Sequence, residues 1–255
     1  MLYIYHIILY NPIYNALIFF YDVLPWHDFG ISIIILTIIL KVLLYPLSVK
    51  ALKSQRALQD LEPKIKALQA QYKDNKQELA KATMDLYKQE KVSPFSSCLP
   101  LLIQFPFLIA LYQAMRQTLQ SKGFEVLYPF ISNPETINPI AFGILDMSKP
   151  NILLAVFAGL AQFFQTRMLP SKRPPKGAGA GAKDEGQMAM MNKQMQYMMP
   201  LLTVFIGASI PAGLTLYWFL TTILTIGQQL LVFNRQKKSA LVAEIIKKED
   251  FKKQE

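Results

Sequence analysis

One long, predominantly apolar stretch restricts the possible folds of this chain more than any other feature. It extends from Phe29 to Ser48, reads FGISIIILTIILKVLLYPLS, and contains a single charged residue, Lys41. A helix needs roughly 20 such residues to cross the hydrocarbon core of a bilayer, which is about 30 Å thick. The run therefore predicts a membrane-spanning helix, and the 52% apolar content of the 255 residues leaves room for several more.

Four further apolar runs cover about residues 96–119, 152–169, 196–210 and 212–233. We therefore expect an all-α membrane protein with five transmembrane helices, because helices satisfy their own backbone hydrogen bonds inside lipid. The expected segments are an amino-terminal interfacial segment (1–28), span one (29–50), a cytoplasmic helical hairpin (51–94), span two (95–120), an external loop (121–150), span three (151–170), a cytoplasmic linker (171–194), span four (195–210), span five (211–234) and a basic cytoplasmic tail (235–255).

Lysine and arginine are distributed unevenly between the apolar runs. Of 27 such residues, ten lie between positions 50 and 91, six between 167 and 193, and seven between 235 and 255. None lies within residues 1–28 or 207–213. Since cytoplasmic loops of membrane proteins are enriched in basic residues, the three rich segments are expected to share the cytoplasmic side. The amino terminus then lies outside and the carboxyl terminus lies in the cytoplasm.

The first 28 residues are apolar and aromatic enough to raise the question of a signal peptide or a further span. A signal peptide is not favoured, because a basic start and a small-residue cleavage site are both missing. Pro12, which follows Asn11, is expected to break the segment into two short pieces. The tyrosines and Trp26 favour a helix lying along the outer membrane surface. A sixth crossing is the alternative that stays open.

The polar stretch between the first two spans has the pattern of two amphipathic helices. Asn75, followed by Glu78, has the form of a helix amino-terminal cap with its reciprocal acid. We therefore predict an antiparallel helical hairpin that projects into the cytoplasm. Residues 173–186 are rich in proline, glycine and alanine and are expected to be a disordered linker. The apolar stripes of the hairpin are Ile65, Leu68 and Tyr72, then Leu79, Thr83 and Leu86.

Residue types that carry redox, metal or hydrolytic chemistry are scarce. Cys98 is the single cysteine, so no intramolecular disulfide or cysteine-based metal site is possible. His6 and His27 lie in the aromatic amino-terminal stretch without a second ligand at helical spacing, so an interfacial role is favoured over metal binding. The net charge of +10 is explained by membrane orientation and predicts no recognition of a nucleic-acid sequence. We expect no cofactor, no metal and no enzyme chemistry.

Lys41 lies deep in span one, roughly 14 Å along the helix from the basic cluster that begins at Lys50. A lysine at mid-span costs about 2.5 to 3.5 kcal/mol, so a water-filled cavity or a functional partner is the default interpretation. Other polar residues recur within the spans, and those of span five share one helical face. Together they predict a polar groove, although hydrogen bonding between packed helices explains each threonine or glutamine equally well. These residues are Thr37, Gln104, Gln162, Gln165, Trp218, Thr221, Thr225 and Gln228.

Three ordered blocks of sequence resemble the YidC family of insertases, which also has mitochondrial and chloroplast relatives. They are GISIIILTIILKVLLYPLS leading into the hairpin with its LEPKI, then KVSPFSSCLPLLIQFPFLIALY, and late in the chain MMPLLTVFIGASIPAGLTLYW. The resemblance covers nearly everything after Asn11. It implies a five-helix bundle around a hydrophilic groove that opens to cytoplasm and lipid, is closed outside, and has no energy-consuming site.

The resemblance also implies roles for particular residues. Lys41 matches a groove cation of the family, often an arginine, and Thr37 matches the polar position four residues earlier. Trp218, in LYW, matches an aromatic client contact, and Gln104 lies in the second-span motif LIQFP. Gln162 or Gln165 carries over as a third-span groove residue. Lysine offers a compact ammonium rather than a planar fork, so preference among acidic clients is expected to differ.

The implied function is insertion and chaperoning of client transmembrane segments in the bacterial inner membrane. The implied partners are nascent membrane proteins and membrane lipids, while contacts with the ribosome, targeting factors and the general secretion channel stay open. A non-catalytic assembly scaffold is the first alternative, because it needs the same client-binding surface. A small-solute transporter is less favoured, since inverted repeats and discontinuous helices are not recognisable.

Overall fold

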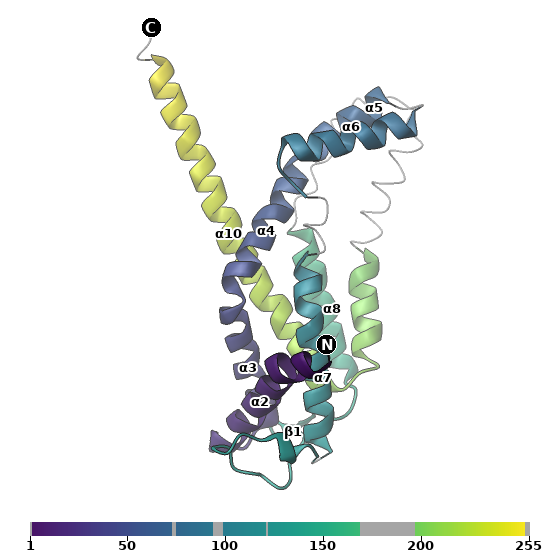
Figure 1. Cartoon of the computed structure of the whole chain (residues 1–255), viewed down its shortest axis with the longest axis vertical. Coiled ribbons are helices and arrows are strands. Elements are labelled where there is room, and N and C mark those ends of the chain that lie inside the picture. Colours follow the sequence, from purple (N-terminus) through teal and green to yellow (C-terminus); the bar gives the residue numbers. More distant parts are fainter. Residues whose placement is uncertain (1, 73–74, 94–98, 121, 169–196, 253–255) are drawn as a thin grey trace.

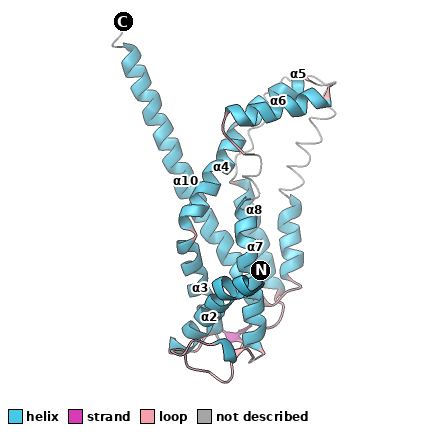
Figure 2. Ribbon diagram, in the orientation of Figure 1, coloured by secondary structure: helices cyan, strands magenta, loops and turns pink. Residues whose placement is uncertain are grey.

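A computed structural model describes residues 2–72, 75–93, 99–120, 122–168 and 197–252. Side chains are described throughout these ranges except at residues 2, 59, 76, 100, 101 and 235–252. The described chain is mainly helical, and its two short strands lie together at one end (Figure 2). The expected linker 171–194 and the start of expected span four lie outside the described residues.

The amino-terminal segment forms α1 (Leu2–Tyr5), a π-helical turn η1 (His6–Tyr10) and α2 (Asn11–Val23). The predicted break at Asn11 and Pro12 is wrong, because the backbone at Asn11 keeps helical dihedral angles of −60° and −45°. Pro12 lies in the first turn of α2, where a missing backbone N–H costs least. The tyrosines were expected at the membrane surface, yet Tyr10, Tyr14 and Tyr21 are buried in the protein core.

The residues of expected span one are divided between two helices, α3 (Phe29–Leu43) and α4 (Tyr45–Asp60). Asp28 caps α3, since its Oδ1 accepts a hydrogen bond from the Ile31 N–H at 3.0 Å. Pro46 cannot donate a backbone hydrogen bond, which explains why the helix is interrupted at Leu44. The helical segments on either side of this break are bent by 66°.

Helices α5 (Glu62–Gln71) and α6 (Lys76–Gln89) contact each other. Lys64, near the start of α5, pairs with Glu90, just after the end of α6, so the two helices run in opposite directions. The predicted cap is present, because Asn75 Oδ1 accepts a hydrogen bond from the Glu78 N–H at 3.2 Å.

Replacing Asn75 with alanine is expected to lower the free energy of unfolding by about 1 kcal/mol, the usual contribution of an amino-terminal cap. Thermal unfolding followed by far-ultraviolet circular dichroism measures this change. Asn75→Asp is the matched control, since aspartate caps a helix as well as asparagine does. An equal loss of stability in both variants would contradict the capping role.

Helix α7 (Leu99–Leu119) leads into a long connection that folds against α2 and α3. This connection contains a 3-10 turn, η3 (Phe124–Val126), and a hairpin of β1 (Ile140–Ala141) and β2 (Leu145–Asp146). In β1 and β2, Ile140 pairs with Asp146 and Ala141 pairs with Leu145. The hydroxyl of Tyr14 donates to the Lys122 carbonyl at 2.8 Å, and that of Tyr21 accepts from the Asn138 N–H at 2.9 Å.

Helix α8 (Ile152–Arg167) is capped by Asn151, whose side chain accepts a hydrogen bond from the Leu154 N–H at 2.9 Å. It packs against a short apolar helix, Tyr197–Gly207, and against the long helix α10 (Ala212–Lys252). Gly159 permits the close approach of α8 to the short helix, because a Cβ there would lie 3.0 Å from the Pro200 carbonyl oxygen. Helix α10 continues without interruption from expected span five into the expected tail.

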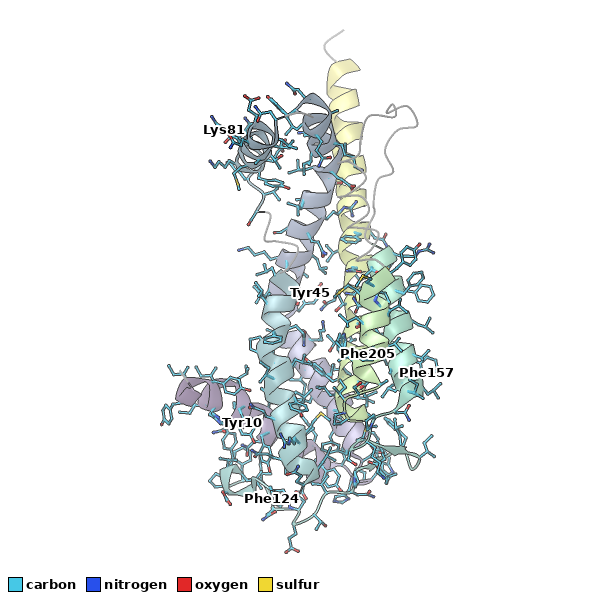
Figure 3. The ribbon with its side chains drawn as sticks, turned by 90° about the vertical axis from the view of Figure 1, so that its right-hand side faces the viewer. Tyr10, Tyr45, Lys81, Phe124, Phe157 and Phe205 are labelled. Atoms are coloured by element: carbon cyan, nitrogen blue, oxygen red, sulfur yellow. The ribbon has the colours of Figure 1, made fainter. Side chains whose placement is uncertain are left out.

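The main hydrophobic core lies at the end of the molecule that contains β1 and β2 (Figure 1). It draws on α2, the first half of α3, the second half of α7, the connecting loop and the start of α10. The last buried core residues along α3 and α10, counted from the β1 and β2 end, are Leu36 and Tyr217. Figure 3 places Phe124 of the loop at this end and Lys81 of α6 at the opposite end.

By length and composition, one described helix segment is sufficient by itself to cross a membrane, Ala212–Asn234 of α10. The bent pair of helical segments Phe29–Leu43 and Tyr45–Gln71 qualifies as a second. The apolar helices Ile152–Arg167 and Tyr197–Gly207 are shorter. Large apolar side chains nevertheless cover the outer faces of several helices, as lipid contact requires. They include Leu102, Phe105, Leu153, Phe157, Leu160, Leu201 and Phe205.

Candidate functional site

Lys41 and Thr225 form the central polar contact between α3 and α10. The Lys41 Nζ donates a hydrogen bond to Thr225 Oγ1 at 2.8 Å, and Lys41 is half-buried. The Thr225 hydroxyl donates in turn to the Thr221 carbonyl at 2.7 Å. Lys41 has no carboxylate partner among the described residues. Its ammonium therefore retains donor capacity for another acceptor.

The polar face of α10 that the sequence predicted contributes further acceptors. Thr221 is buried, and neither its hydroxyl oxygen nor Gln228 Oε1 has a hydrogen-bond partner among the described residues. Buried polar atoms of this kind are normally satisfied by water or by a ligand. Thr37, one turn before Lys41, is also buried, but its hydroxyl donates to the Ile33 carbonyl of its own helix at 2.6 Å.

A second polar contact joins α7 to α10 through Gln104 and Tyr217. The Gln104 side-chain amide donates to the Tyr217 hydroxyl. Sequence reasoning singled out Gln104 but missed Tyr217, although Tyr217 lies beside Trp218 in the LYW motif. It also missed Gln229, which is buried with an unpartnered side-chain oxygen. A second glutamine directly after Gln228 in an apolar helix was the available signal.

Three further predicted residues, like Thr37, Thr221 and Gln228, take no part in these two side-chain pairs. Gln162 and Gln165 are half-buried on α8, and Gln162 contributes only its carbonyl, which accepts from the Thr166 hydroxyl at 3.0 Å. Trp218 is half-buried on α10, and its carbonyl accepts from the Thr222 hydroxyl at 2.9 Å. The structure therefore joins Lys41 with Thr225 and Gln104 with Tyr217. Among the described residues, no hydrogen bond links Gln162 or Gln165 to either pair.

Arg56 of α4 contacts Phe233 of α10, about two helix turns after Thr225. Its guanidinium donates to the Phe233 carbonyl at 3.2 Å and lies 5.0 Å from the centre of the Phe233 ring. The combination of a hydrogen bond and a cation–π contact fixes the base of the α5 and α6 pair to α10. Sequence reasoning did not identify Arg56, because a backbone carbonyl and a ring leave no charge pattern to match it.

The chemistry of the site is hydrogen bonding and charge attraction. Within the described part of the chain, no group of three or more His, Cys, Asp and Glu side chains is placed to hold a metal ion. Lys41 and Thr225 follow Leu36 and Tyr217, the last buried core residues of α3 and α10, and are not members of the main hydrophobic core. One cation and several acceptors in this position can bind a polar segment reversibly, since hydrogen bonds form and break without covalent steps.

The mainly helical fold and the apolar outer faces of its helices are those of an all-α membrane protein. Residues 19–239 match the family model described as 60Kd inner membrane protein. The chain belongs to this family of bacterial inner-membrane proteins, the family of the YidC insertases.

Curated relatives carry the same identification. The chain is 34% identical over 230 residues to the protein called membrane protein insertase YidC from Francisella tularensis subsp. novicida (strain U112). It is equally similar to the protein of that name from Francisella tularensis subsp. tularensis (strain SCHU S4 / Schu 4). Each alignment covers 86% of this chain and 36% of the relative. The chain thus spans little more than a third of the length of these relatives.

Proposed function

We propose that this chain is a membrane protein insertase and chaperone that admits the polar flank of a client into a groove between α3, α7, α8 and α10. The carrying observation is the position of Lys41, half-buried beyond the end of the main core and bonded only to the neutral Thr225 among the described residues. The name of the Francisella relatives, membrane protein insertase, supports the same function.

In this proposal the groove consists of Lys41 and Thr225 with six further polar residues and Trp218. Its outer end is closed by the core around the loop, and its other end opens to the cytoplasm and to lipid. A client's hydrophobic segment passes directly into the bilayer, and burial of its apolar surface drives transfer without nucleotide hydrolysis. The further groove residues are Thr37, Gln104, Gln162, Gln165, Trp218, Thr221 and Gln228.

The proposed topology has five spans, with the loop outside and the α5 and α6 pair in the cytoplasm. Two observations support it. The loop and the α5 and α6 pair lie at opposite ends of the bundle (Figure 3). The basic residues of the chain are also concentrated near one of these ends, within residues 50–91 and 235–255. Clients are nascent membrane proteins, delivered by the ribosome, targeting factors or the secretion channel.

The experiment uses liposomes that contain the purified protein and a single-span client with an acidic tail. Protection of the tail from external protease is expected to fall roughly fivefold in Lys41→Ala, which corresponds to a charge interaction of about 1 kcal/mol. Lys41→Glu is expected to fall further, because like charges repel, while Lys41→Arg retains most activity. Lys149→Ala, which removes an exposed lysine of the loop, is the control and is expected to behave as the parent does.

Protection equal to that in empty liposomes would reject the insertase proposal and favour an assembly scaffold. Protection above empty liposomes, with Lys41→Ala equal to the parent, would reject the role of Lys41 and leave insertion itself in place. The two parts of the proposal are therefore tested separately.

A further inference from the structure

The hairpin of β1 and β2 has an aromatic residue where turn geometry disfavours one. The Ile144 N–H donates to the Ala141 carbonyl at 3.1 Å, so Phe142 and Gly143 are the central residues of the turn. Both have positive φ, 53° and 72°, as type I′ turns require. Asparagine followed by glycine is the usual pair in such turns, and a bulky residue at positive φ is strained. Backbone strain of this kind points to a function for the side chain it positions.

The hairpin is fixed to the first turn of α3. Asp28 accepts from the Phe142 N–H through Oδ2 at 2.6 Å while its Oδ1 caps α3. Ala141 packs so closely on Gly30 that a Cβ at residue 30 would lie 2.6 Å from that of Ala141. The tip of the hairpin therefore lies level with the beginning of α3, where the apolar run of span one starts.

Large apolar side chains are exposed at this level. Ile144 is 89% exposed, Trp26 is 72% exposed and Phe142 is 45% exposed. Trp26 precedes His27, another non-glycine residue at positive φ (46°), whose ring contacts that of Tyr21 at 5.8 Å. The two unfavourable backbone conformations, at His27 and Phe142, thus both lie beside Asp28, which follows His27 in the chain and accepts from the Phe142 N–H.

We propose that Trp26, Phe142 and Ile144 form an outer anchor, immersed among the headgroups and upper acyl chains of the outer leaflet. The start of a membrane-spanning helix is the depth at which tryptophan and other aromatic residues are enriched. The apolar and aromatic character of these exposed side chains suits this depth of a bilayer better than it suits water. The inference rests on the proposed topology, with α3 as a span that begins on the outer side.

The test places a fluorescent nitrobenzoxadiazole label on Ile144→Cys in a Cys98→Ser background, with the full chain in phosphatidylcholine vesicles. Lipids with a spin label near the headgroup are expected to quench the emission, and lipids labelled deep in the acyl chain are expected to quench it less. Thr136→Cys, an exposed site in a polar part of the same loop, is the control and is expected to show little quenching. Equal quenching at both sites, or none at residue 144, overturns the proposal.

A second variant separates anchoring from turn stability. Phe142→Asn supplies the residue that the turn prefers but removes the ring that packs on Gly30. The Ala141 contact with Gly30 and the hydrogen bond from the residue 142 N–H to Asp28 are expected to keep the hairpin folded while quenching at residue 144 falls. Unchanged quenching in this variant would overturn the role of Phe142. Emission that is water-like in purified vesicles but blue-shifted when the label is read in native membranes would assign the tip to a protein partner and reject the lipid proposal. Client insertion in the same vesicles tests the proposed function independently.

Discussion

Gly159→Leu is expected to lower the free energy of unfolding by about 3 kcal/mol, the upper part of the usual range for overpacking. A side chain at this position meets the Val204 side chain and the Pro200 carbonyl oxygen, and a backbone atom cannot move aside as a side chain does. Small residues permit such close approaches between helices in membranes. Thermal unfolding in detergent, followed by tryptophan fluorescence, measures the effect, and Gly159→Ala is expected to give an intermediate loss.

Gly227→Ala is the matched control for Gly159→Ala. Apart from its chain neighbours and the adjacent backbone of α10, no atom lies within 4 Å of a Cβ placed at Gly227. Alanine there is expected to be neutral or to stabilise the helix by about 0.5 to 1 kcal/mol, because glycine loses more backbone entropy on folding. If Gly159→Ala and Gly227→Ala change stability equally, the close approach at Gly159 is not a determinant of the fold.

Asn15→Ala is expected to loosen the attachment of residues 126–128 of the loop after α7 to α2 and to cost about 3 kcal/mol of unfolding free energy. The Asn15 amide donates to the Val126 carbonyl at 3.0 Å and accepts from the Tyr128 N–H at 2.6 Å. Asn15 is buried and both hydrogen bonds are partly buried, so alanine would leave two backbone groups of the loop without their protein partner. Limited proteolysis of the loop, together with thermal unfolding, measures the release.

Asn133→Ala provides the comparison within the same loop. Asn133 is exposed, and its side chain accepts a single hydrogen bond from the Glu135 N–H at 3.0 Å. Water replaces such a bond readily, so a change within about 0.5 kcal/mol is expected. Cleavage of the loop at the parent rate in Asn15→Ala would argue against this attachment.

Residue pattern predicted local features of the fold better than it predicted their packing. The Asn75 cap follows from a spacing of three residues, which is a property of one helix turn. The buried positions of Tyr10 and Tyr14 could not be predicted in the same way, because aromatic side chains suit both a membrane surface and a core. The break at Leu44 had a local signal in Pro46, whereas Pro12 had the same signal and produced no break.

In the candidate site, too, features of a single helix were predictable from the sequence, whereas contacts between helices were not. The spacing of Thr221, Thr225 and Gln228 predicted a shared face of one helix, and Lys41 was conspicuous by its charge. Which of them Lys41 contacts depends on the rotation of α3 against α10, and rotation is set by packing over the whole interface. The Gln104 and Tyr217 pair, from helices far apart in the sequence, depends on packing in the same way.

The unbroken course of α10 has a mechanical consequence. A helix of 41 residues is about 60 Å long, roughly twice the thickness of the hydrocarbon core, so part of it must stand clear of the bilayer. Thr225 lies inside the bundle, Phe233 is held by Arg56, and the remaining turns extend beyond that contact. Because the helix is continuous, a tilt of the part of α10 after Phe233 would pivot near the Arg56 contact. The tilt would then also move Thr225, which accepts the hydrogen bond from Lys41.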